Sequence, residues 1–412
     1  MKHVAIGFVT GRKHFQNVLK SYINNWLEQG LIGDEKIMLN LFISYDLKYQ
    51  ATKISDYKNI PEELAKMVES INFYGSDKIA KEKEWLQENK ILSHAETELV
   101  FGDGYARKRN IVMYFAIKSK MDNLVFLDDD EYPMSVVKND AGKLSWMGQS
   151  VVGTHLNNID NADITHGHHC GYISPIPYLR FNNILTENDF KGFIEAVSND
   201  IITWEKIKEV VIGNKGVTFA DMEIINNDHV TEVTEENGMK FISGGNLCIN
   251  LKNAGKLPPF YNPPGARGED TFMSTALSDL KVMKVPCYTF HDGFSMYNHM
   301  LNGVLPTVLT PVDYQLSATT RRFVNAAVGW IRYKPLLVYI TQQDNYDKVM
   351  KDIEQKLIFV IPKLCQFFNT KDFNQILKEF YQYSKKVELH YKEFEATKKA
   401  WSKVIQSIGK SE

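Results

Sequence analysis

The amino-acid sequence predicts an α/β protein that carries a separate helical region at its C-terminal end. Short apolar runs alternate with amphipathic helical periodicities over roughly the first 130 residues. Four consecutive acids directly follow one of these runs, at residues 128–131, and long helical periodicities dominate from about residue 305. We therefore divide the chain into three parts, residues 1–134, 135–304 and 305–412.

The first part has the pattern of a doubly wound sheet. The run at 4–9 is almost unbroken in its apolar character, as expected of a strand buried on both faces, and apolar residues then recur at helical spacing from Phe15 to Trp26. Because such sheets bind ligands beyond the carboxyl ends of their strands, we expect a site there. The further strands predicted are 37–44, 71–74 and 124–127, and the further helices are one beginning at Pro61 and one at 107–118.

The rest of the chain is more irregular and then helical. We expect mixed sheet and loops between 135 and 264, with a helix near 203–210 and a strand at 241–251, followed by a helix at 271–280 and a strand at 281–290. Residues 321–412 hold 17 Lys+Arg and 10 Asp+Glu, a local excess of +7. A solvated helical face is favoured there over contact with a membrane or an anionic polymer.

Composition excludes several classes of protein. The chain has 412 residues, of which 44% are hydrophobic, so it can bury a sizeable core. The 48 basic and 50 acidic residues give a net charge of −2, which does not indicate a nucleic-acid-binding protein. Since no apolar stretch approaches the roughly 20 residues that span a bilayer, we expect a cytoplasmic protein. The spacing of the four cysteines fits neither a disulfide framework nor a zinc ribbon: Cys170, Cys248, Cys287 and Cys365.

The acids at 128–131 indicate a cation site. Four neighbouring carboxylates repel one another, so a fold that brings them to one spot normally supplies a cation. In an extended segment Asp128 and Asp130 share a face, and two oxygen ligands on one face suit Mg²⁺ or Mn²⁺ that also holds a diphosphate. The alternative is a solvated acidic turn.

The strand and acids at 124–130 resemble the DxD signature of GT-A-fold glycosyltransferases, which use nucleotide-sugar donors. Upstream, the segment 102–110 is similar to the glycine-then-ARN segment of glycosyltransferase family 2. The resemblance implies that Arg107, Arg109 and Asn110 position the donor, and a helix N-terminus with cations suits its diphosphate. The alternative is an exposed basic helix start.

The segment 265–272 resembles the ED motif of the same family, which implies catalytic roles for Glu269 and Asp270. Asp270 would be the base that removes the proton of the acceptor hydroxyl. The structural alternative, which is compatible with the catalytic one, is that these acids supply the N-cap and a first-turn acid of the helix that follows and interact favourably with its dipole.

Two further segments match the family's pattern. His291, after the strand at 281–290, corresponds to a histidine that many GT-A enzymes use as a further metal ligand, and imidazole suits Mn²⁺ better than Mg²⁺. A hydrogen-bonded structural histidine is the alternative, and His299 is a weaker candidate ligand. Around Gly244, Gly245 and Asn246 the sequence looks like the glycine-rich strand start that borders the sugar, with a β-bulge as the alternative.

The histidine-rich segment 166–170 is tempting as a transition-metal site, but a polar loop near the acceptor is favoured because no second ligand pair stands at zinc spacing. The remaining residues assigned to the donor site follow the first two strands or belong to the acidic run: Thr10, Gly11, Arg12, Asp46, Asp128 and Asp129. Asp46 would contact the nucleotide base, although its strand departs from the usual DDGS-type sequence.

The resemblance covers roughly residues 1–300 and implies a metal-dependent hexosyltransferase with Mn²⁺ or Mg²⁺. Residues 1–134 would bind the nucleotide sugar and 135–304 the acceptor, a glycan or small molecule with a hydroxyl group. Residues 305–412 lie outside the common core and could contact the inner membrane face or another subunit. The reaction would be inverting, with a retaining mannosylglycerate-synthase-like transferase or a non-catalytic carbohydrate-binding or scaffold protein as alternatives. A nucleotidyltransferase and a haloacid-dehalogenase phosphatase are disfavoured, because the chain lacks their motifs.

Overall fold

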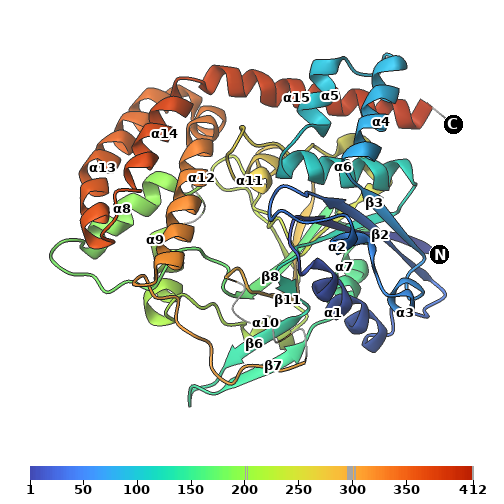
Figure 1. Cartoon of the computed structure of the whole chain (residues 1–412), viewed down its shortest axis with the longest axis horizontal. Coiled ribbons are helices and arrows are strands. Elements are labelled where there is room, and N and C mark those ends of the chain that lie inside the picture. Colours follow the sequence, from blue (N-terminus) through green and yellow to red (C-terminus); the bar gives the residue numbers. More distant parts are fainter. Residues whose placement is uncertain (200, 202, 295–299, 301–302, 411–412) are drawn as a thin grey trace.

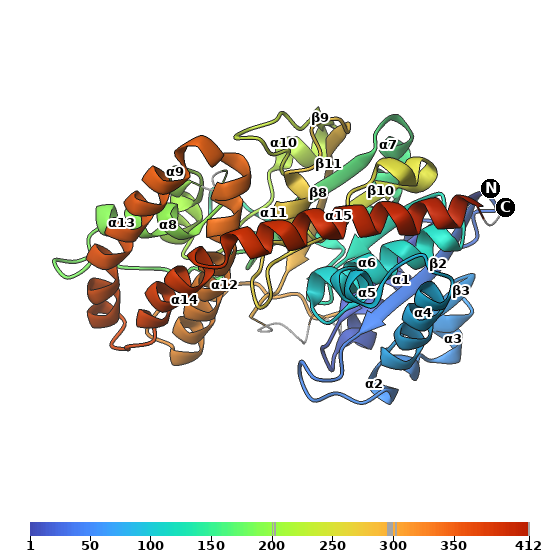
Figure 2. The ribbon, with the colours of Figure 1, turned by 90° about the horizontal axis from the view of Figure 1, so that it is seen from above.

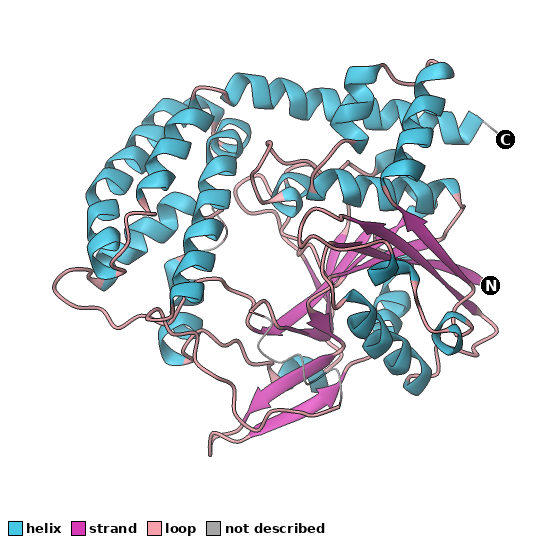
Figure 3. Ribbon diagram, in the orientation of Figure 1, coloured by secondary structure: helices cyan, strands magenta, loops and turns pink. Residues whose placement is uncertain are grey.

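A computed structural model describes residues 1–199, 201, 203–294, 300 and 303–410. A mixed sheet is covered by helices on both faces, and a group of long helices lies to one side of it (Figures 1 and 3). The α/β class and the C-terminal helical region are therefore confirmed. No helix in the described ranges combines the length and the apolar composition needed to cross a bilayer.

The main sheet has the order β3-β2-β1-β4-β10-β8-β11-β5, and β9 pairs with β11. Neighbours among β3, β2, β1 and β4 are parallel, whereas β10 runs antiparallel to both β4 and β8. β8 and β11 are parallel to each other and therefore share the direction of the first four strands. The strands are β1 Lys2–Thr10, β2 Ile37–Tyr45, β3 Ser70–Tyr74, β4 Asn123–Leu127, β5 Glu131–Tyr132, β8 Ile164–Gly171, β9 Thr231–Glu232, β10 Leu247–Asn250 and β11 Val282–His291.

This topology brings the carboxyl ends of β1, β2, β4, β8 and β11 to one edge of the sheet. A separate hairpin, β6 (Met134–Lys138) with β7 (Leu144–Gly148), packs against β8 and β11. An apolar core forms on each face of the sheet, one with α1 and α7 and the other with α5, α6 and α11. These helices and their smaller neighbours are α1 Phe15–Glu28, α2 Ser55–Lys58, α3 Glu62–Ala65, α4 Ser76–Glu88, α5 His94–Phe101, α6 Tyr105–Lys118, α7 Val151–Asn158, α10 Met222–Asn226 and α11 Glu269–Ser274.

The helical region has an apolar core of its own and is also anchored to the sheet domain. α8 packs against α12 and α13, so a helix from the middle of the chain joins this group. α15 runs back across α5 and α6 (Figure 2), and the buried Trp401 indole donates a hydrogen bond to the Leu257 carbonyl at 2.9 Å. The helices are α8 Glu187–Val197, α9 Trp204–Lys208, α12 Ser317–Thr341, α13 Tyr346–Phe367, α14 Asn374–Ser384 and α15 Val387–Lys410.

Most predicted elements of the first part are confirmed, and so is the strand at 281–290. The strand predicted at 241–251 is wrong over its first half, since only Leu247–Asn250 is extended within the sheet. Gly244 and Gly245 have no side chains that could pack against neighbouring strands. Asn246 has a left-handed φ of 49°, a backbone conformation that interrupts a strand, so the strand begins only at Leu247. The helix at 271–280 ends early, at Ser274, and the one expected at Pro61 is a single turn.

The polar loop expected at 166–170 is also wrong, because these residues belong to β8 in the middle of the sheet. His169 pairs with Glu131, and Thr165 bonds to His155. Polar partners inside the fold thus stabilise a strand whose polar composition is typical of a loop.

Candidate functional site

The carboxylates at 128–130 lie at the carboxyl end of β4, in the centre of the sheet edge described above. Asp128 is 3.0 Å from Nη2 of Arg109, and the Tyr105 hydroxyl donates to it at 3.1 Å. Burial raises the pKa of Asp128, Arg109 opposes the rise, and Glu131 and Asp130 add to it. This carboxylate therefore sits in a region of accumulated negative charge that protein cations only partly offset.

Arg12, just beyond the end of β1, bridges the next two carboxylates. Its Nε lies 2.9 Å from Asp129 and its Nη2 lies 2.6 Å from Asp130. Thr10 donates to Asp129 at 2.6 Å. Burial raises the pKa of Asp129 to about 6 against the opposing charge of Arg12. The structure thus brings the predicted residues Thr10 and Arg12 together with the acidic run.

His291, at the end of β11, reaches the same carboxylates. Its Nε2 is 3.4 Å from Asp130, and its Nδ1 is 2.9 Å from the Tyr172 carbonyl oxygen, to which it donates. Burial disfavours the charged ring, but Asp130 outweighs it and raises the pKa of His291 to about 9. Burial likewise opposes ionisation of Asp130, yet His291 and then Arg12 hold its pKa well below the usual range. The other candidate, His299, lies outside the described residues.

Glu131, the fourth acid, has partners inside the sheet. Its carboxylate lies 3.0 Å from Nε2 of His169 and accepts a hydrogen bond from Thr289 at 2.9 Å. It is 2% exposed. Its role is therefore to join β5 to β8 and β11 under the three more accessible carboxylates.

Glu269 and Asp270 begin α11, after Gly268, whose φ of 84° favours glycine. Both acids lie in the first turn of α11, so their interpretation as first-turn acids is confirmed, whereas the N-cap position is taken by Gly268. The backbone N–H of Thr271 donates to Asp270 at 2.8 Å. Glu269 forms an ion pair with Nε of Arg109 at 3.5 Å. Burial, and then the neighbouring Asp270, raise the pKa of Glu269 to about 7, and burial also raises that of Asp270. Glu269 can therefore hold a proton near neutral pH.

The glycine-rich segment lies directly against the carboxylates. A Cβ added at Gly245 would stand 2.8 Å from Oδ2 of Asp128, so only glycine allows this approach. The Gly244 carbonyl accepts a hydrogen bond from Nη1 of Arg109 at 2.6 Å. The Asn246 side chain is fully buried and bonds to Nε2 of His155 at 2.9 Å, inside the sheet domain. Contact of this segment with a sugar stays a prediction.

The basic start of α6 is not an exposed surface. Arg107 and Arg109 are 8% and 1% exposed, so that alternative is wrong for both. Arg107 donates to the Asn262 carbonyl at 3.2 Å, and Asn110 bonds to both backbone groups of Phe260. These two side chains anchor the segment that leads to α11, and their predicted contact with a donor is untested.

Asp46 and Gly11 lie near the same sheet edge. The backbone N–H of Asp46 donates to the Thr10 carbonyl at 2.8 Å, and its carboxylate is 3.9 Å from Nζ of Lys108. A Cβ added at Gly11 would meet the ring of Tyr49. The turns that follow β1 and β2 are therefore packed together beside the carboxylates.

Sequence reasoning missed Arg322, which α12 contributes from the helical region. A side chain at Gly293 would collide with its guanidinium and with His291, so Arg322 lies close to the end of β11. Its Nε is buried and has no hydrogen-bond partner among the described residues. Burial lowers the pKa of Arg322 to about 10, with Asp130 opposing. Only the local excess of basic residues at 321–412 could have drawn attention to it.

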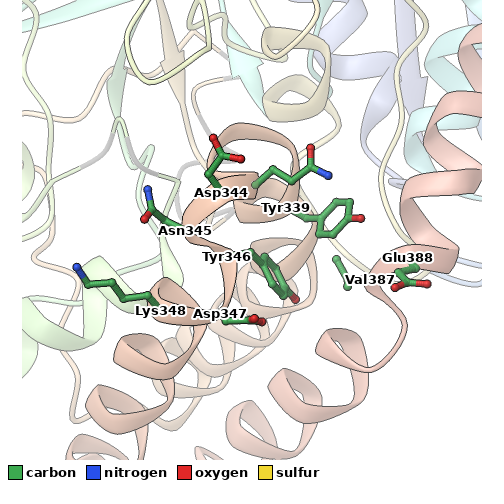
Figure 4. A pocket seen from close by; sticks show the side chains of 9 residues that line it. Tyr339, Asp344, Asn345, Tyr346, Asp347, Lys348, Val387 and Glu388 are labelled. Atoms are coloured by element: carbon green, nitrogen blue, oxygen red, sulfur yellow. The ribbon is translucent and has the colours of Figure 1, made fainter.

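Two hollows of about 490 and 450 Å³ lie within the helical region, away from the carboxylates. The larger is lined from the ends of α12 and the starts of α13 and α15, by residues such as Tyr339, Tyr346 and Glu388 (Figure 4). Neither includes a residue predicted for the site. Ion pairs between distant segments converge instead on the carboxylate cluster.

No family model matches the chain, and a search of curated proteins finds no significant match. The resemblance to glycosyltransferases therefore remains a prediction from the motifs.

The buried His155 predicts how stability depends on pH. Burial lowers its pKa to about 4, although hydrogen bonds in which Asn246 accepts from the imidazole oppose this shift. As the pH falls, His155 is therefore protonated in the unfolded chain before it is protonated in the folded protein. The stability that neutral His155 contributes above pH 6.5 is lost as the pH falls toward 4. We expect this histidine alone to account for about 2 kcal/mol of lost stability between pH 7 and pH 5.

Urea denaturation at both pH values, on the wild type and on His155→Gln, measures this difference. The variant should lose less stability on acidification than the wild type does. Equal losses in the two proteins would contradict the assignment.

Proposed function

We propose that this protein is a metal-dependent glycosyltransferase of the GT-A type, which moves a hexosyl unit from a nucleotide-diphospho-sugar to a hydroxyl acceptor. One observation carries the proposal: Arg109 joins the β4 carboxylate Asp128 to Glu269 of the acidic pair. A carboxylate that would hold the metal ion of the diphosphate and a candidate base group are thus neighbours at the sheet edge where α/β proteins bind ligands.

The residues at this edge are chemically suited to a divalent ion. Asp128, Asp130 and His291 would hold Mn²⁺ or Mg²⁺, with the imidazole favouring Mn²⁺. Within the described ranges, no three histidine, cysteine or acidic side chains are already arranged to coordinate a metal ion. Asp130 instead forms an ion pair with Arg12. Ion and diphosphate would therefore bind together. The ion, when bound, neutralises the diphosphate and makes it a better leaving group.

Protein cations would assist the departing nucleotide. A guanidinium binds phosphate oxygens in the same forked geometry that Arg12 now uses for its two carboxylates. Arg322 adds a second guanidinium with an unused N–H. Fixed cations aimed at developing negative charge stabilise a transition state without reorganisation.

The acidic pair would act on the acceptor. As the anomeric carbon gains positive character, the deprotonated Asp270 would take the proton of the attacking hydroxyl. Its raised pKa makes it a better base than an exposed aspartate. Transfer should therefore decline as the pH falls below the raised pKa values of the pair, of which that of Glu269 is about 7.

Donor binding tests the first half of this proposal. We expect Mn²⁺ plus one of the UDP-, GDP-, dTDP- or CDP-sugars to raise the melting temperature by about 3 °C at 100 Kd, and neither component alone to do so. Asp130→Ala should abolish the rise. Asp160→Ala is the control. It removes a half-exposed carboxylate that pairs with Lys2 at the amino end of β1, whereas the site lies at the carboxyl ends of the strands, so this variant should retain the rise in melting temperature.

Folded protein that shows no rise with any donor would favour the non-catalytic alternative. A rise that survives Asp130→Ala would show that the donor binds elsewhere.

Substitution of the base tests the second half. Asp270→Asn keeps an oxygen that can accept the hydrogen bond from the Thr271 backbone N–H but cannot accept the proton, so the rate of transfer should fall by about 10²- to 10⁴-fold. Donor-induced stabilisation should be unchanged. Undiminished transfer, measured as release of nucleoside diphosphate, would exclude Asp270 as the base and favour a retaining mechanism.

A further inference from the structure

Three basic side chains lie together on one face of β8 and β11. The register pairs His166 with Lys284, and alternate residues of a strand share a face, so His168 lies on that face as well. Tyr288, the partner of His168, packs against its imidazole in a tilted arrangement with ring centroids 5.0 Å apart. The strand β11 has a bulge between Lys284 and Tyr288, where Pro286 lies. The side chains of Lys284 and Tyr288 still point to the same face of the sheet.

The cluster has no acidic partner in the described part of the chain. His166 is 1% exposed, and neither of its ring nitrogens has a hydrogen-bond partner there. His169, on the opposite face of the same strand, is by contrast paired with Glu131. Burial lowers the pKa of His166 and of Lys284, and the charge of Lys284 further lowers those of both histidines. Unpaired buried polar groups of this kind need a ligand or water.

The cluster is connected to the acidic pair by a short segment. The ring of Phe241 meets the His166 imidazole edge-on, with centroids 5.9 Å apart. Three residues later, a Cβ at Gly244 would lie 3.6 Å from Oε1 of Glu269. Because an extended chain advances about 3.3–3.6 Å per residue, this segment spans at most roughly 10 Å. The two ends of this segment therefore lie against His166 and Glu269.

We infer that His166, His168 and Lys284 bind the anionic group, a carboxylate or a phosphate, of a small hydroxylated acceptor. This inference rests on the proposed function, because it assigns the acceptor of that reaction. The ammonium of Lys284 and an imidazole N–H donate to the anion, which supplies the partner that His166 lacks. The hydroxyl of the same molecule extends along the Phe241–Gly245 segment toward Asp270. A neutral sugar acceptor would leave the cluster unpaired.

Binding without donor or metal tests the site directly. We would titrate glycerol 3-phosphate against glycerol, and glycolate against ethylene glycol, using calorimetry and the side-chain ¹⁵N signals of the histidines. At least one anion should bind and shift the His166 signals, whereas its neutral counterpart should not. Lys284→Met should weaken binding at least tenfold, Lys284→Arg should restore part of it, and Lys281→Met, an exposed neighbour before β11, should leave it unchanged.

Two results would overturn the inference: equal binding of anionic and neutral compounds, including no binding of either, or unchanged affinity in a folded Lys284→Met protein. The melting-temperature panel with donors and Mn²⁺ is scored separately on the same proteins. Donor binding without anion binding rejects the acceptor assignment and leaves the proposed function standing. Anion binding through Lys284 without donor binding supports the anion site and rejects the transfer reaction.

Discussion

The buried guanidinium of Arg109 is the interaction on which the rest of the site depends. Its three nitrogens are within 2.6–3.5 Å of Gly244, Asp128 and Glu269, which belong to three separate segments. The aromatic rings of Tyr105, Phe126 and Phe260 surround it at 4.9–5.5 Å. A buried charge in such surroundings is tolerated only when it is paired, and removing one partner typically costs 3–5 kcal/mol. Arg109 therefore holds together the groups for which we propose chemistry.

The same balance of charge extends along the sheet edge. Arg12 follows β1, His291 ends β11 and Arg322 comes from α12, and all three act on Asp130. No single structural unit supplies the positive charge that offsets the carboxylate of Asp130. The helical region is therefore joined to the site electrostatically through Arg322, and to the sheet domain through the packing of α15 against α5 and α6.

The strands and the acidic run could be predicted because their signals are local. An apolar run at 124–127 followed by acids needs no knowledge of distant residues, and the helical spacing after residue 15 is similarly self-contained. Arg322 and the cluster around Lys284 could not be predicted, because their meaning depends on which strands and helices become neighbours. The histidines of β8 misled the prediction in a further way: polar residues favour a loop unless partners elsewhere, such as Glu131 for His169, satisfy them. Asn246 shows the same limit, since a segment expected to border a ligand directs its side chain to His155.

We propose that the carboxylates of β4 and His291 form a metal-dependent diphosphate site. Anomalous diffraction at the manganese absorption edge, from crystals grown with Mn²⁺ and a nucleoside diphosphate that stabilises the protein, tests it most directly. We expect an anomalous peak within coordination distance of Asp128, Asp130 and His291, with the diphosphate beside Arg12. Manganese found only elsewhere, or a diphosphate bound away from this edge, would contradict it.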